Sequence, residues 1–160
     1  MPGAPAPMSW PRRAASPPPT ESPAGRERRI GATRKVWAAG RDARRTPVAA
    51  YLRARGITVE PPRSLRWSPR CWHGGARAEL PAMLACADGP DGELCGVHRT
   101  YLGRDPDGTW CRRDRASLGP IGGGAMRLVA PRPPFDKGSG APLIVAEGIE
   151  TMLAAMIATG

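Results

Sequence analysis

The chain has 160 residues, of which 20 are glycine and 20 proline, and a formal net charge of +10. This length allows one small domain followed by the start of another, and the composition predicts a modest core with much irregular structure. No run approaches the roughly eighteen apolar residues that span a bilayer, and the opening MPGAPAPMSWPRR lacks the apolar stretch of a signal peptide. We therefore expect no membrane partner and a cytoplasmic protein with reduced thiols.

Basic residues are concentrated in one segment of the chain. Ten Arg or Lys stand against two acids from Arg26 to Arg55, whereas from Gly56 onward the count is twelve against eleven. A clustered positive field favours nucleic acid or another polyanion as the partner. The alternative is codon bias of a GC-rich coding sequence, since Arg outnumbers Lys 22 to 2. The two explanations remain open.

The first half of the chain predicts a tail and a pair of helices. Residues 1–32 are rich in proline and arginine and are expected to be a disordered or polyproline-like tail. Thr33 to Arg45 has helical periodicity. A second helix is better marked, with Thr46 as its cap, Pro47 in its first turn and Gly56 at its closing position.

Short extended pieces follow from Leu65 and predict a small antiparallel β meander. Ala82 to Ala87 and Leu94 to Leu102 flank a turn-rich connection with Asp-Gly twice, which indicates a hairpin. Thr109 to Arg112 is expected as a third strand, and Ala125 to Val129 as a further one. Residues 33–130 thus form a helix pair with a meander, and residues 131–142 form a linker rich in Pro and Gly.

The four cysteines do not have the spacing of a zinc site. Cys71, Cys86, Cys95 and Cys111 are 15, 9 and 16 residues apart, and no CxxC pair is present. Although Cys71 and His73 form a CxH step, we expect small buried thiols and no zinc.

The C-terminal segment has the pattern of a strand followed by a helix. Leu143 to Ala146 is an unbroken apolar run, typical of a strand buried on both faces of a parallel sheet. An apolar helical stripe follows at Ile149, Met152, Leu153, Met156 and Ile157, and Gly160 stands where the helix would close. Glu147, at the end of the strand, is placed to act as a general base or to help hold a hard cation. The alternative is that the amides of the first helical turn merely stabilise this acid, as they would Glu150.

These residues resemble a known family. LIVAEGIET, followed by an apolar helix and Gly160, resembles the opening motif of the Toprim domain of primases, topoisomerases and related nucleases. The EGIET form, with Gly148 and Glu150, resembles plasmid- and phage-type primases and primase-helicases. Upstream, PVAAYLRARGI, LRWSPRCWH, PAMLACADGPDGELCGVHRTYL and LGPIGGGAMRL are similar to the region that precedes Toprim in these mobile-element proteins, so the resemblance covers roughly residues 33–160.

The resemblance implies a fold and a set of site residues. The expected fold is α+β: the helix pair, the meander, and in residues 143–160 the first βα unit of an α/β Toprim domain. Glu147 would be the acid-base residue, and a later Asp-x-Asp pair would hold Mg²⁺. Arg99, Arg112 and Arg113 would hold template and nucleotide, which suits a bidentate guanidinium. The alternative for Arg99 is a side chain that simply points to solvent.

The function implied is that of a DNA primase or primase-helicase, a metal-dependent nucleotidyltransferase of DNA replication. Its partners would be single-stranded DNA, nucleotides and a helicase domain or subunit. No Asp-x-Asp follows Gly160 in this chain, so we expect a fragment that is inactive alone. The alternatives are a non-catalytic nucleic-acid-binding or interaction module, and a gene remnant without function.

Overall fold

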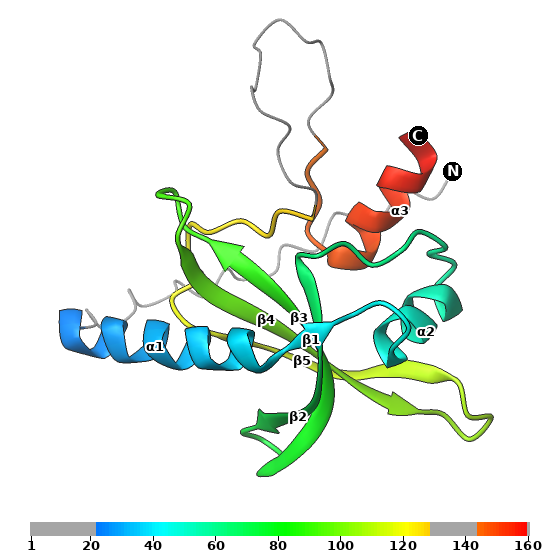
Figure 1. Ribbon diagram of the computed structural model, residues 1–160, viewed down its shortest axis with the longest axis horizontal. Helices are drawn as coiled ribbons and strands as arrows, with labels where there is room; N and C mark the ends of the chain where they lie inside the picture. Colours follow the sequence, from blue (N-terminus) through cyan, green and yellow to red (C-terminus); the bar gives the residue numbers. More distant parts are fainter. Residues whose placement is uncertain (1–21, 129–143, 160) are drawn as a thin grey trace, which may run out of the picture.

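Helices cover both faces of one antiparallel sheet in this computed structural model, which describes residues 22–128 and 144–159 (Figure 1). The elements in chain order are α1 (Pro23–Ala39), β1 (Arg41–Asp42), α2 (Pro47–Ala54), β2 (Leu65–His73), β3 (Ala78–Asp88), β4 (Leu94–Arg104), β5 (Trp110–Leu118) and α3 (Ile149–Thr159). The strands pair in the order β1-β2-β3-β4-β5, each antiparallel to the next. The predicted α+β class and antiparallel meander are therefore confirmed.

The two faces of the sheet pack against different helices (Figure 1). One, which we call the α2/α3 face, forms the larger core, whose buried residues include Val48, Tyr51, Leu52, Leu65, Met83, Ala85, Leu102, Leu128, Ile149 and Leu153. The other, the α1 face, buries Cys71, Ala82, Leu84, Val97 and Tyr101, with Val36 and Trp37 of α1 against them. Because α3 contributes Ile149 and Leu153 to the larger core, it is joined to the sheet by hydrophobic burial.

Helix α1 begins earlier and ends earlier than the sequence pattern predicts. Ser22 caps it by accepting a hydrogen bond from the amide of Gly25, and Pro23 occupies the first turn, where a missing amide costs nothing. Residues 23–32, expected in the disordered tail, are therefore helical. The helix stops at Gly40, where a Cβ atom would lie 2.9 Å from Cβ of Arg66, and the chain turns into β1.

Helix α2 forms as its sequence predicts. The Thr46 side chain accepts a hydrogen bond from the amide of Val48, Pro47 is the first residue, and Gly56 has a φ of 77°. Val48, Tyr51 and Leu52 face the core. Local signals were sufficient here because capping, the first turn and the closing glycine all lie within eleven residues.

The sheet is larger than predicted. The β3–β4 hairpin is confirmed, but β2 is a full strand although it contains Pro69, which lies at a shift in register between Ser68 and Cys71. Strand β5 continues to Leu118. Ala125 makes only an isolated antiparallel bridge to Asp88, so the strand expected from Ala125 is wrong within the described residues.

The C-terminal helix is confirmed, but its expected strand is not. Residues 144–146 have no strand pairing and Val145 is 79% exposed, so a strand buried on both faces is wrong for these residues. The physical reason is that a parallel strand needs a neighbouring strand to pair with, and every strand of this sheet is already antiparallel. Leu143, the 131–142 linker and Gly160 lie outside the described residues.

The helices within residues 22–128 and 144–159 lack the length and apolar character needed to cross a membrane.

The packing of α3 predicts unequal effects of two substitutions on the same helix. Leu153 is fully buried, so Leu153→Ala is expected to lower the free energy of unfolding by about 2–5 kcal/mol. Ile157 is 40% exposed, so Ile157→Ala is expected to change it by only about 0.5 kcal/mol. Urea denaturation of both variants checks this. Equal effects would mean that α3 does not pack on the sheet in solution.

Candidate functional site

Three elements meet at Glu150, in the first turn of α3. The hydroxyl of Tyr51, from α2, donates a hydrogen bond to Oε1 of Glu150. Nη1 of Arg112, from β5, lies 3.9 Å from the same oxygen. The Glu150 side chain is 21% exposed and that of Arg112 is 49% exposed. The carboxylate is thus held on its inner side by a tyrosine and faces an arginine at the surface.

Burial keeps Tyr51 in the role of hydrogen-bond donor. Its side chain lies in the larger core, and burial, followed by the bond to Glu150, raises the pKa of Tyr51 well above its ordinary value of 10.0. The phenol therefore remains protonated at every physiological pH. The partial positive charge of the amides in the first turn of α3 also stabilises the carboxylate of Glu150.

A β-bulge gathers two arginines on the α2/α3 face. Arg112 pairs with Leu102 and Arg115 with Thr100, so both lie on the same side because Leu102 and Thr100 are two residues apart on β4. Residues three apart on a regular strand would point to opposite faces. Arg113 is the extra residue of the shift in register, and it brings Arg115 to the site.

His98 lies among these charges. It pairs with Ser117 across β4 and β5, and its Nδ1 lies 3.4 Å from Oγ of that serine. Burial lowers the pKa of His98 below 6.5, Arg115 and Arg112 lower it further, and the carboxylate of Glu150 opposes them. The ring is therefore neutral near pH 7. We call Glu150, Arg112, Arg115, His98 and Ser117 the α3 cluster.

The other predicted site residues are not part of the α3 cluster. Glu147 is exposed ahead of α3, and it makes no hydrogen bond or ion pair with any residue that the structure describes. The carbonyl of Gly148 accepts a hydrogen bond from the amide of Met152 at 2.9 Å, at the start of α3. Nη2 of Arg113 donates to the carbonyl of Arg104 at 2.6 Å, so this guanidinium serves the β4–β5 turn.

Arg99 lies on the opposite side of the sheet. It pairs with Leu84, on the α1 face, and its two terminal nitrogens donate to the carbonyls of Trp72, at 3.0 Å, and Ser117, at 3.3 Å. Its Nε is buried and has no hydrogen-bond partner among the described residues. Arg99 is therefore not a solvent-pointing side chain, and its contact with the α3 cluster is to the backbone carbonyl of Ser117.

The basic segment from Arg26 to Arg55 does not form one surface. Helix α1 carries its first half along the α1 face, and α2 carries Arg53 on the other side of the sheet (Figure 1). The basic residues of α1 and those of α2 therefore do not form one continuous binding surface.

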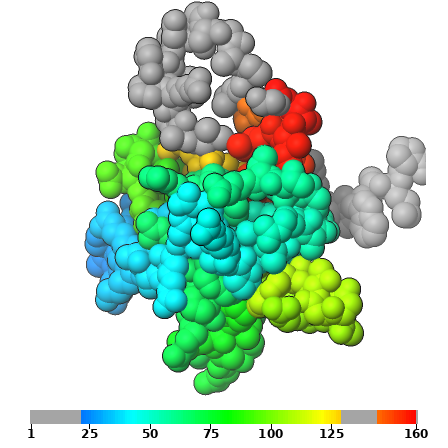
Figure 2. Space-filling view, turned by 45° about the vertical axis from the view of Figure 1, so that its right-hand side comes forward, coloured from blue at the N-terminus to red at the C-terminus, as the bar shows by residue number. Residues whose placement is uncertain are grey.

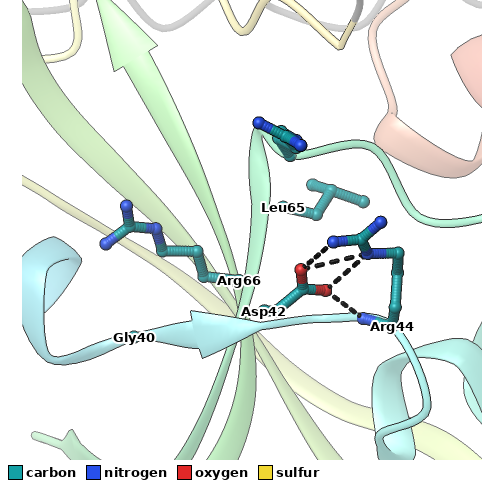
Figure 3. Close-up of a pocket in the computed structure, with 6 residues that line it drawn as sticks. Gly40, Asp42, Arg44, Leu65 and Arg66 are labelled. Atoms are coloured by element: carbon teal, nitrogen blue, oxygen red, sulfur yellow. Dashed lines mark hydrogen bonds and ion pairs between the residues drawn. The ribbon is translucent and has the colours of Figure 1, made fainter.

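An open pocket of the described structure contains a paired charge (Figure 3). It has a volume of about 310 Å³ and is lined by Gly40, Asp42, Arg44, Arg63, Leu65 and Arg66. Asp42 accepts hydrogen bonds from the Arg44 amide, at 2.8 Å, and from its guanidinium Nε, at 3.0 Å. These bonds lower the pKa of Asp42 to about 2. The pocket thus lies between β1 and the start of β2, and the carboxylate that lines it, Asp42, is already paired with Arg44.

Cys71 and His73 do not form a catalytic pair. Nδ1 of His73 accepts the amide of Ala76 at 2.8 Å, and its Nε2 lies 2.7 Å from Oδ2 of Asp114. Both ring nitrogens are engaged, and burial raises the pKa of the Cys71 thiol. The histidine fixes the end of β2 and does not activate the cysteine.

The described residues do not by themselves fit a magnesium ion. No group of three or more His, Cys, Asp or Glu is gathered among residues 22–128 and 144–159. Glu150 is already bonded to Tyr51, which leaves Glu147 as the one exposed carboxylate of the EGIET segment.

Removal of the Glu150 charge should lower the pKa of His98. The Glu150→Gln variant loses the carboxylate that favours the imidazolium, while Arg112 and Arg115 remain. Histidine resonances followed by NMR across pH measure this shift, and His73, the second of the two histidines, is the internal control because it contacts Asp114. An unchanged or raised pKa of His98 would place Glu150 away from the cluster.

Comparison with known proteins identifies a family and no nearer relative. The family described as "Domain of unknown function (DUF7146)" matches residues 27–128, from the first turns of α1 to Leu128 in the larger core. No curated protein and no solved structure matches the chain. Helix α3 lies outside the matched range but packs on it. Because the match covers more than half of the 160 residues, the chain belongs to the DUF7146 family.

Proposed function

We propose that this chain is part of a Toprim-type DNA primase or primase-helicase and that the α3 cluster contacts single-stranded DNA and nucleotides. The observation that carries the proposal is the contact of Glu150, in the EGIET segment, with Arg112 of the DUF7146 domain. The contact joins the motif that resembles Toprim to a strand that carries three arginines.

The chemistry of the cluster supports phosphate binding. Arg112 and Arg115 lie on one face of β5, both are exposed, and the side chain of Arg115 makes no ion pair with a described residue. A guanidinium binds a phosphate through two parallel hydrogen bonds. Ser117 extends the same row with a hydroxyl that can donate to phosphate.

Glu147 is the acid-base candidate of the proposed enzyme. It is exposed and carries no ion pair with a described residue, so its carboxylate is available to a substrate hydroxyl. Nucleotidyl transfer also requires an acidic metal-binding pair. Asp105 and Asp107 do not supply it, because Asp105 contacts Arg113 at 3.2 Å and Asp107 accepts the amide of Thr109 at 2.9 Å within the β4–β5 turn. We therefore propose no metal-dependent step through the described residues.

The second candidate is a non-catalytic nucleic-acid-binding or interaction module. It is favoured by Glu150, whose carboxylate is occupied by Tyr51 and Arg112, as expected for an acid that fastens α3 to the sheet. In this reading the proposed helicase partner and the cytoplasmic location are unchanged, but Glu147 has no catalytic role.

A binding experiment tests the role of the α3 cluster. Replacement of Arg112 and Arg115 by alanine is expected to weaken binding of a fluorescent single-stranded oligonucleotide and to reduce the salt slope by roughly 0.7 for each lost phosphate contact. Arg28→Ala with Lys35→Ala, on α1, is the matched control because it removes two exposed charges from the other face of the sheet. If only the α1 variant reduces the slope, the contact surface is α1 and the α3 cluster is not involved.

Primer synthesis separates the two candidates. The 160-residue chain with Mg²⁺ is expected to make no primers, and activity comparable to that of complete primases would contradict the incomplete acidic site. In a form of the protein that does synthesise primers, Glu147→Gln is expected to abolish synthesis and to leave oligonucleotide affinity unchanged. If synthesis persists in that variant, Glu147 is not the acid-base residue.

A further inference from the structure

One tryptophan is exposed on a part of the sheet that no helix covers. Trp72 is 56% exposed, near the end of β2, beside the turn that leads to β3. The β2–β3 hairpin forms the lower lobe of the molecule in both views (Figures 1 and 2). An indole in this position does not add to either core, since neither hydrophobic cluster includes Trp72.

The backbone beneath this side chain is held by two residues of β4. The carbonyl of Trp72 accepts hydrogen bonds from Nη1 of Arg99, at 3.0 Å, and from the hydroxyl of Tyr101, at 2.7 Å. Burial raises the pKa of Tyr101 to about 12, so its hydroxyl remains a donor. These two bonds anchor the backbone from which the indole of Trp72 projects.

The next residue is held as well. His73 lies against the ring of Tyr101, with 4.4 Å between ring centroids, and its Nε2 contacts Asp114 of β5 at 2.7 Å. The end of β2 is thereby tied to both β4 and β5. Trp72 thus projects from an anchored part of the backbone, which loses little conformational entropy when a ligand binds.

One arginine of the β2–β3 hairpin has no acidic partner among the described residues. Glu79 is the cross-strand partner of Trp72, and Arg70 and Arg77 are exposed on either side of Trp72 in the sequence. Arg70 is 78% exposed and is paired with Glu79 at 2.6 Å, whereas Arg77 makes no ion pair with a described residue. An exposed indole between arginines has the composition of a surface that stacks a base and contacts the neighbouring phosphates.

We propose that Trp72 stacks on a nucleobase of single-stranded nucleic acid and that Arg77 contacts the adjoining phosphate. This inference rests on the nucleic-acid partner of the proposed function, but it concerns a different place, since Trp72 is outside the α3 cluster. A protein partner is the less favoured occupant because a protein hot spot is usually shielded from water by surrounding contacts, whereas Trp72 is the one large hydrophobic side chain that is exposed on the described part of the sheet.

Affinity measured against salt concentration tests the proposal with the full chain and a fluorescent oligo(dT). Trp72→Ala is expected to weaken binding on the order of tenfold and to leave the salt slope unchanged, because the lost ring is uncharged. Trp72→Phe is expected to retain most of the affinity. Arg77→Ala is expected to reduce the slope by roughly 0.7. Ile157→Ala, which removes another exposed apolar side chain, is the matched control.

Two further measurements make the outcomes decisive. Thermal unfolding of Trp72→Ala should match that of the unaltered chain, since the ring is exposed. An oligonucleotide of abasic sites should bind the unaltered chain and Trp72→Ala equally. If the unaltered chain and Trp72→Ala bind oligo(dT) equally, while the variant with Arg112 and Arg115 replaced by alanine binds it weakly, the stacking proposal is wrong and the proposed function stands. If the unaltered chain binds no oligonucleotide, the stacking proposal and the proposed function are both wrong. Binding of a protein partner through Trp72 would also contradict the stacking proposal.

Discussion

The hydrogen bond from the Tyr51 hydroxyl to Glu150 connects the parts on which the proposed site depends. It joins residues 99 positions apart and places the first turn of α3 over the sheet. Tyr51 is fully enclosed by the larger core, so the bond is sheltered from water on the side of the phenol. Without it the carboxylate would lose its inner partner, and the geometry of Glu150, Arg112 and His98 would depend on hydrophobic packing of α3 alone.

The arginines on the two faces of the sheet differ in how far their guanidinium groups are used by the fold. On the α1 face, Arg66 donates to the carbonyl of Trp37 at 2.7 Å and stacks on its ring, and Arg99 binds two carbonyls. Both are committed to the fold. On the α2/α3 face, Arg112 and Arg115 remain exposed beside α3. The net charge of the chain is therefore a poor guide to polyanion binding. The arginines whose guanidinium groups stay accessible in the fold are a better one.

Local signals predicted the elements whose causes are local. The cap and closing glycine of α2 and the Asp-Gly turn of the β3–β4 hairpin lie within a few residues of what they determine. The site could not be predicted in this way, because Arg115 reaches it through a bulge at Arg113 that only the register of β5 reveals. The sequence suggests that Arg99 binds template or nucleotide. In the structure its guanidinium instead donates a hydrogen bond to the carbonyl of Trp72, which lies 27 residues earlier in the chain. The start of α1 is missed if Pro23 is interpreted as a sign of disorder, because a proline that follows a capping residue favours the first turn of a helix.

A double-mutant cycle on Tyr51→Phe and Glu150→Ala measures directly whether the hydrogen bond between these residues holds α3 against the sheet. The free energy of unfolding is measured by urea denaturation for the unaltered chain, both single variants and the double variant. We expect the effects of the two substitutions to be non-additive, with a coupling energy of about 0.5–3 kcal/mol. Additivity within about 0.3 kcal/mol would contradict it, since the two side chains would then act independently.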